Sequence, residues 1–174
     1  MIKVKSILQK YSIPIAGLSS GTYAYSFVLD NEIFEFYDHP DVKNGTIKIE
    51  LTLIKRSNVF EIDIKAQGIL EVQCDRCLDL FDYPIETTEH IICTIGQQEG
   101  YTAENIIVLN KGETSIELGQ EFYEIVVTEI PIQKLHPLDE NQESTCNPEM
   151  MKLLNQYTIR EDKTSPMQTL GDII

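Results

Sequence analysis

The chain has 174 residues, 42% hydrophobic and 24% charged, and this composition predicts a folded domain with its own core and excludes a disordered chain. No apolar run approaches the roughly 18 residues that a membrane-spanning helix needs, and residues 1–18 lack the unbroken apolar block of a signal peptide, so we expect a cytoplasmic protein. With a formal net charge of −14, the overall electric field will not attract the chain to a phosphate backbone.

The negative charge is unevenly distributed. Residues 99–149 contain 11 acidic and 2 basic side chains, whereas the first 29 residues contain three lysines and no acidic residue. This distribution favours a basic protein partner, or nucleic-acid contact through a local basic patch. The alternative is that the acidity only keeps the protein soluble.

Two elements are expected before the main sheet. Residues 22–29 are aromatic and β-branched, which predicts a strand. A short helix is expected at residues 31–37, because Asp30 can cap its first turn and His39-Pro40 ends it.

The centre of the chain has a clear two-residue period. Apolar and polar residues alternate over roughly 46–56, 59–73 and 81–95, which predicts three antiparallel strands in a meander. Gly68 interrupts the second run and predicts a bulge or a bend.

The second half is expected to be loops and helices. Thr114 and Glu117 match a capping box, so we expect a helix from about 115 to 130 that ends at Pro131. The remaining predicted elements are a loop over 96–105, a short strand over 106–109, a second helix from Pro148 to about Gln156, and a flexible tail over 158–174.

The fold class predicted from these elements is α+β: a mostly antiparallel sheet with two or three packed helices. We expect a single domain over residues 1–157. Its core would span 22–130, and residues 131–157 would form an extension that contains cysteine and histidine.

Cysteine and histidine form two short clusters. Cys74-Asp75-Arg76-Cys77, here called the knuckle, lies in the expected turn between two strands, and His136 and Cys146 flank a polar loop far downstream. Thiolates and an imidazole suit a tetrahedral zinc ion, so Cys74, Cys77, His136 and Cys146 are the candidate ligands of one structural zinc. Closure of such a site requires the loop to meet the knuckle in space.

Two other interpretations of these cysteines remain open. The wide spacing between His136 and Cys146 favours a protein that binds no metal and acts as a structural adaptor. A thiol redox protein using Cys74 and Cys77 is the other alternative, although a thioredoxin-like motif begins a helix and this one joins two strands. Cys93 lies between Ile91 and Ile95 on an apolar face, so we expect a core residue. No residue pattern indicates catalysis, and we expect no enzyme.

The segment ILEVQCDRCLDLFDYPI resembles the motif of the YceD family, a bacterial group named for the accumulation of large-subunit ribosomal RNA. The matching residues around the knuckle are Gly68, Cys74, Arg76, Cys77 and Leu78. A second, similar block begins with IELGQEFYEIVVTEIPIQKLHP and matches at Leu118, Glu129, Pro131, His136 and Cys146. The resemblance covers about residues 45–157.

The resemblance implies an accessory role in large-subunit (23S) ribosomal RNA accumulation and ribosome assembly, by binding rather than catalysis. The implied partners are a large-subunit ribosomal protein or precursor ribosomal RNA, with no membrane and no small-molecule substrate. Direct contact with RNA would depend on a few basic side chains, chiefly Lys3, Lys5, Lys10 and Arg76.

Overall fold

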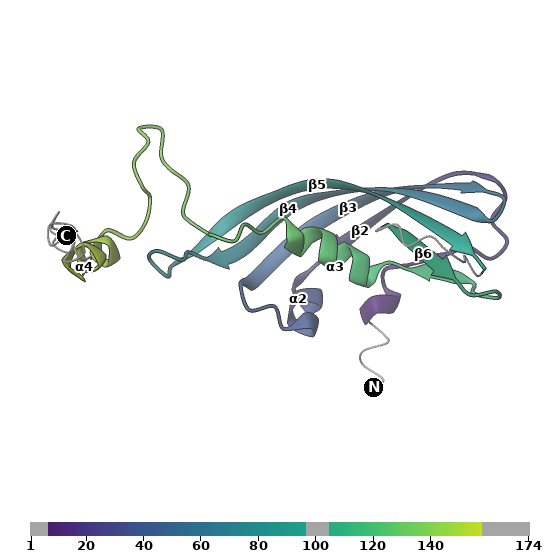
Figure 1. Cartoon of the computed structure of the whole chain (residues 1–174), viewed down its shortest axis with the longest axis horizontal. Helices are drawn as coiled ribbons and strands as arrows, with labels where there is room; N and C mark the ends of the chain where they lie inside the picture. Colours follow the sequence, from purple (N-terminus) through teal and green to yellow (C-terminus); the bar gives the residue numbers. More distant parts are fainter. Residues whose placement is uncertain (1–6, 97–104, 158–174) are drawn as a thin grey trace, which may run out of the picture. The chain divides into compact units, whose positions relative to one another are not determined.

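The computed structural model describes residues 7–96 and 105–157. Its largest element is a five-stranded sheet with the strand order β2-β3-β4-β5-β6, antiparallel except for the parallel pair β5–β6 (Figure 1). The strands are β2 (Gly21–Leu29), β3 (Val42–Arg56), β4 (Val59–Gln73), β5 (Leu80–Ile95) and β6 (Ile106–Leu109).

The predicted meander is confirmed, and burial of one face explains its register. Leu51 of β3 pairs with Ile64 of β4, and Phe60 of β4 pairs with Cys93 of β5. All four side chains are buried, so a slip of one residue would move the whole apolar set into water. Cys93 is a core residue, as predicted.

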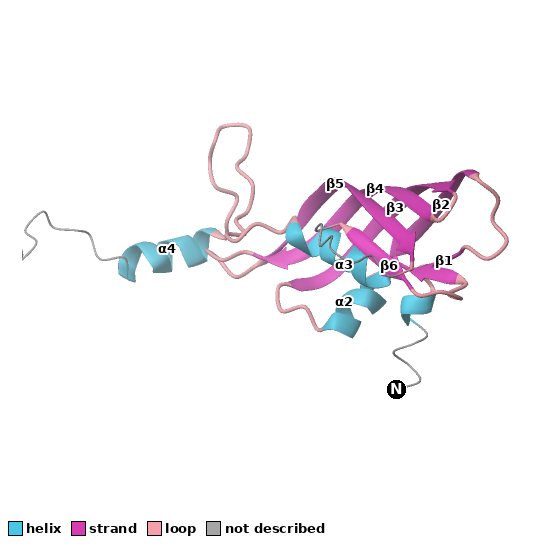
Figure 2. Ribbon diagram, turned by 45° about the vertical axis from the view of Figure 1, so that its right-hand side comes forward, coloured by secondary structure: helices cyan, strands magenta, loops and turns pink. Residues whose placement is uncertain are grey.

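Helices cover one face of the sheet only (Figure 2). They are α2 (Asn31–Tyr37), which Asp30 caps as predicted, and α3 (Gly119–Thr128). Phe122 and Val126 of α3 are buried in the same core as Ile33 of α2. Tyr37 stacks on Tyr123 with ring centroids 4.0 Å apart, which packs the two helices together.

The predicted start of the second-half helix is wrong. Residues from Ser115 to Glu117 form strand β7, which pairs with β1 (Ser12–Pro14), and α3 begins only at Gly119. Leu118 occupies the N-cap and makes no side-chain capping bond. The capping box does not start a helix here, because Ile116 pairs with Ile13 of β1 and both side chains are buried.

Gly68 is not a bulge, since β3 and β4 pair without interruption on both sides of it. Its function is to allow close approach. A Cβ at this position would lie 2.1 Å from the carbonyl oxygen of Thr46 and 2.8 Å from the Cα of Ile47.

By proximity of Cα atoms, the chain divides into two compact units. Unit 1 comprises Met1–Gln73 and Leu80–Lys134, and unit 2 comprises Cys74–Asp79 and the chain from Leu135. Unit 2 contains α4 (Pro148–Tyr157), which begins at the predicted proline. Among the described residues, no helix has the length and apolar character needed to cross a membrane. The predicted tail over 158–174, and most of the loop over 96–105, lie outside the described residues.

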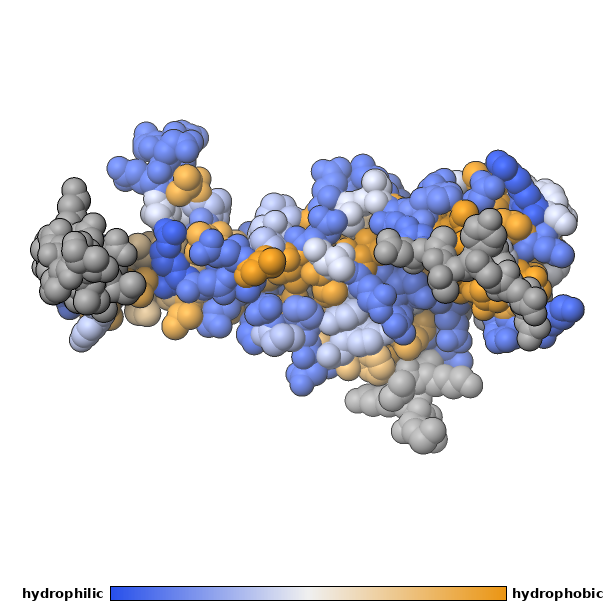
Figure 3. All heavy atoms as spheres, viewed as in Figure 1, coloured by the Kyte–Doolittle hydropathy of each residue, from blue (hydrophilic) through white to orange (hydrophobic). Residues whose placement is uncertain are grey.

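The α+β class is confirmed by this arrangement. Hydrophilic residues cover much of the molecular surface in Figure 3, with smaller hydrophobic patches between them.

Candidate metal centre

The knuckle is held by a tight turn of backbone hydrogen bonds. The Cys74 amide donates to the Asp79 carbonyl at 2.9 Å, and the Leu78 amide donates to the Cys74 carbonyl at 2.9 Å. Leu78 has φ 66°, a left-handed conformation that is uncommon for a branched side chain. This turn closes the strand connection over only six residues, Cys74–Asp79, and turns both sulfurs inward.

The loop between His136 and Cys146 folds back on itself. Leu138 and Ser144 form an isolated antiparallel bridge, and the Thr145 hydroxyl donates to the Pro137 carbonyl at 2.7 Å. At the loop tip, the Asp139 carboxylate accepts from the amides of Asn141 and Glu143 at 2.9 and 2.8 Å. The two ends of the loop therefore lie together, which removes the objection raised by their wide sequence spacing.

The four candidate ligands converge within unit 2. The Sγ atoms of Cys74, Cys77 and Cys146 and a ring nitrogen of His136 all lie within 4.8 Å of one another. Cys74 and Cys146 have their sulfurs 3.8 Å apart, and the Cys77 sulfur lies 3.4 Å from His136 Nδ1.

These distances fit a tetrahedral ion. Zinc bonds of about 2.3 Å to sulfur and about 2.0–2.1 Å to nitrogen separate two sulfurs by about 3.8 Å, and a sulfur from a nitrogen by about 3.6 Å. No disulfide links the cysteines, which are all free thiols. The set can therefore hold a metal ion with three sulfurs and one imidazole.

Backbone amides surround the thiols. Burial alone would raise the pKa of Cys74, but hydrogen bonds from the amides of Cys77, Arg76 and His136 and from the His136 side chain together lower that pKa to about 6. Burial dominates at Cys77 and raises its pKa, against amide bonds from Asn147 and Asp79. Donors aimed at sulfur stabilise the thiolate form, which is the form that binds a metal.

Unit 2 has no hydrophobic core in the residues that the structure describes. Its fully buried side chains are Cys74, Cys77 and Cys146, with 0%, 1% and 6% of their surfaces exposed. No side chain of α4 is buried. A unit of this kind depends on something other than apolar burial for its stability, and a bound ion is the usual solution in small domains.

A pair of polar residues braces the site. Asn147 donates from Nδ2 to the Asp79 carboxylate at 3.0 Å, while its Oδ1 accepts from the Glu149 amide at 3.0 Å and so caps α4. Sequence reasoning missed both side chains. The only available signal was the Asn147-Pro148 dipeptide, which is typical of a helix start.

The sequence of this chain matches one protein-family model. The model described as "Large ribosomal RNA subunit accumulation protein YceD" matches residues 62–173, which include all four candidate ligands. The chain belongs to the YceD family. Searches of curated proteins and of solved structures found no match.

Two of the four basic residues predicted to contact nucleic acid lie among the described residues of this YceD family member. Lys3 and Lys5 lie outside the described residues. Lys10 belongs to unit 1 and forms an ion pair with Glu32, whereas Arg76 is half-buried beside the candidate ligands of unit 2.

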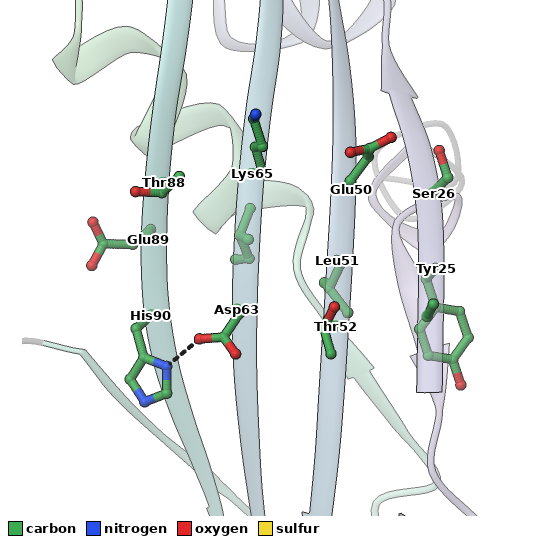
Figure 4. Close-up of a pocket in the computed structure, with 12 residues that line it drawn as sticks. Tyr25, Ser26, Glu50, Leu51, Thr52, Asp63, Lys65, Thr88, Glu89 and His90 are labelled. Carbon is green, nitrogen blue, oxygen red and sulfur yellow. Dashed lines mark hydrogen bonds and ion pairs between the residues drawn. The ribbon is translucent and has the colours of Figure 1, made fainter. Parts of the chain in front are cut away.

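The open face of the sheet has a hollow of about 760 Å³, which is lined mostly by polar and charged residues together with Ala24, Leu51 and Ile64 (Figure 4). His90 points toward Asp63 with Nδ1 and Oδ1 2.7 Å apart, and Glu50 pairs with Lys48 at 2.6 Å. These charges largely satisfy one another at the surface, as expected for a solvated sheet face. The thiol and imidazole cluster is the stronger candidate site.

Proposed function

We propose that this protein is a non-enzymatic accessory factor for the accumulation of large-subunit (23S) ribosomal RNA and for ribosome assembly in the cytoplasm. The observation that carries the proposal is the family match over residues 62–173. The partner is a large-subunit ribosomal protein or precursor ribosomal RNA. The excess of acidic side chains over residues 99–149 favours the basic protein.

Cys74, Cys77, His136 and Cys146 hold one structural zinc ion in this proposal. Support comes from the convergence of their ligand atoms within 4.8 Å and from the absence of apolar burial in the described part of unit 2. Four protein ligands fill a tetrahedral shell and leave no position for a reacting water. The ion therefore ties the knuckle to the loop and to α4, and a role in binding fits better than catalysis.

Affinity purification from growing cells tests the assembly role. A tagged chain at native expression level should recover large-subunit proteins or precursor RNA, and deletion of the gene should lower the ratio of large-subunit to small-subunit RNA. Recovery of neither, together with an unchanged RNA ratio, rejects the role. A tagged chain that carries Cys74→Ser shows in the same experiment whether the metal centre is needed.

A second candidate function is thiol redox chemistry, favoured by the lowered pKa of Cys74, about 6, and by the proximity of Cys77 and Cys146. Incubation with oxidised glutathione tests it in the metal-loaded protein. Rapid formation of a mixed or internal disulfide supports redox chemistry, whereas thiols that react only after chelation support the structural zinc.

A further inference from the structure

A groove of about 330 Å³ lies in unit 1 between α3 and the adjoining parts of β5 and β6. Its apolar lining comes from four isoleucines, Ile91, Ile106, Ile107 and Ile125. Ile91 is buried and the other three are half-buried, so the groove presents apolar surface to a ligand. None of its lining residues is a candidate metal ligand, since those four residues all belong to unit 2.

Four carboxylates surround this apolar surface, and no lysine, arginine or histidine lines it. Glu89 accepts a hydrogen bond from Asn105, Glu124 accepts from Gln120 at 2.8 Å, and Glu129 accepts from Thr87 at 2.8 Å. All these donors are neutral. The fourth carboxylate is Glu121, and within the described chain none of the four belongs to an ion pair.

Among the four carboxylates of the groove, Glu121 is the one whose surroundings disfavour its negative charge. Glu121 is half-buried, and its burial, together with the charges of Glu124 and Glu117, raises its pKa. A cation in the groove would relieve this cost. The carboxylates do not converge on one point: among described residues, only the thiol and imidazole cluster gathers three or more potential metal ligands. Several separated cationic groups fit better than a single metal ion.

The backbone beside the groove is an unpaired strand edge. β4 pairs with β5 along its whole length, but β6 pairs only with Ile92–Ile95, so within the described chain residues 80–91 of β5 have a neighbouring strand on one side. The Ile92 amide points away from β4, toward the side on which residues 80–91 have no neighbouring strand, since it donates to the Asn105 carbonyl. By the two-residue period, Glu86 and Thr88 direct their amides and carbonyls to the same side.

Other residues limit the length of this edge. Pro84 has no amide hydrogen to offer, and the His90 carbonyl accepts from Asn105 Nδ2 at 3.1 Å. The available stretch is therefore short and centred on Glu86 and Thr88. It runs beside Thr87 and Glu89, whose side chains line the groove.

We propose that this groove binds a short, extended basic segment of a protein partner, which adds as a strand to the free edge of β5 and places lysine or arginine side chains among the four glutamates. This inference rests on the proposed function, and it assigns the docking site for the basic partner. Side chains of an added strand alternate between the groove and the open face, so every second residue of the segment is basic. The methylene stems of those residues pack on the isoleucines while their charged ends reach the carboxylates.

Fluorescence anisotropy of a labelled peptide in which lysine alternates with valine tests the proposal on the full, metal-loaded chain at physiological ionic strength. The double variant Glu121→Gln/Glu124→Gln should weaken binding about tenfold or more. The control Glu71→Gln/Asp82→Asn removes the same charge from a cross-strand pair on the open face, and should change binding by less than about twofold. Circular dichroism confirms that both variants are folded.

Backbone pairing is tested separately on the unmodified protein. In the labelled peptide, methylation of alternate backbone nitrogens removes the N–H groups that would donate to carbonyls of β5. Only one of the two possible methylation patterns affects the N–H groups that face β5, so one pattern should abolish binding and the other should not. Equal weakening by both double variants would mean that binding follows only the overall charge, and would overturn the proposal. The proposal would also be overturned if neither methylation pattern changed binding, or if the unmodified peptide did not bind at all.

Failure of this inference and failure of the proposed function give different results. Large-subunit components that are recovered equally by the wild type and by Glu121→Gln/Glu124→Gln reject the groove but keep the assembly role. A peptide that binds the groove as expected, with no ribosomal component recovered from cells, rejects the assembly role and keeps the groove.

Discussion

Asn147 donates to the Asp79 carboxylate at 3.0 Å and thereby joins the two chain segments that supply the candidate metal ligands. Asp79 follows Cys77 by two residues, and Asn147 follows Cys146 directly. The amides of these same two residues also donate to the Cys77 sulfur. Both residues thus hold the Cys77 sulfur in place through their backbone amides, while their side chains link the two segments.

Replacement of Asn147 by alanine should therefore weaken metal binding without removing a ligand. Loss of a residue that orients the ligands typically costs 10–100-fold in metal affinity, and loss of the helix cap adds about 1 kcal/mol of destabilisation. Competition with a chromophoric chelator measures the affinity. Asn155→Ala, an exposed change in α4, is the control, and equal affinities in both variants would show that the Asn147–Asp79 bond has no such role.

Cys74→Ser should remove the bound metal. A serine hydroxyl is a poor zinc ligand, and the three remaining ligands leave the site open, so we expect zinc content to fall from about one ion per chain to a small fraction. Elemental analysis of the purified protein measures it. Cys93→Ala also removes one thiol, but from the core of unit 1, and should retain the full zinc content. Full occupancy in Cys74→Ser would exclude the proposed ligand set.

The sheet was predictable because one face of each long strand is buried. Alternation in β3, β4 and β5 marks that face directly in the sequence, and no other register buries it. The beginning of α3 was not predictable, because pairing between β1 and β7 joins residues about a hundred positions apart. Thr114 illustrates the conflict: its carbonyl accepts from the amides of Ile15 and Ala16, a tertiary contact that local capping rules cannot include.

The candidate ligands could be selected from residue type and the spacing of the knuckle, but their closure could not. His136 and Cys146 meet because the Asp139 turn and the bridge between Leu138 and Ser144 fold the loop back. These are ordinary polar contacts with no distinct sequence pattern. The sequence showed the excess of acidic residues but could not predict the groove, since its carboxylates come from β5 and from α3 with its C-cap, which are far apart in the chain.

Gly68→Ala should destabilise the sheet strongly. The added Cβ would meet the Thr46 carbonyl oxygen at 2.1 Å, and this neighbour is backbone that cannot rotate away. We expect a loss of at least about 2 kcal/mol in the free energy of unfolding. Urea denaturation of the metal-loaded protein measures it, with Gln67→Ala on the exposed side of the same strand as control. A stability loss no larger than that of the control would contradict the close approach of β3.

Cys93 should make stability depend on alkaline pH. Burial, together with the charge of Glu121, raises its pKa to about 12 in the folded protein, whereas an exposed thiol ionises near about 8.5. The contribution of Cys93 to the free energy of unfolding is complete below about pH 8.5. It is lost as the pH rises toward 12, because in this range only the unfolded state releases the thiol proton. Urea denaturation at a series of pH values should show a shallower alkaline decline for Cys93→Val than for the wild type. Identical slopes would show that Cys93 does not contribute.

Removal of the metal should unfold unit 2 while the sheet remains folded. The described part of unit 2 buries only its three cysteines, whereas the core of unit 1 contains more than twenty buried hydrophobic side chains. We therefore expect a chelator to abolish hydrogen-exchange protection over residues 135–157 and to leave β3 and β4 protected. Added zinc should restore protection and added magnesium should not, because magnesium prefers oxygen ligands. Protection of residues 135–157 that survives complete removal of the metal would mean that backbone hydrogen bonds alone hold this unit together.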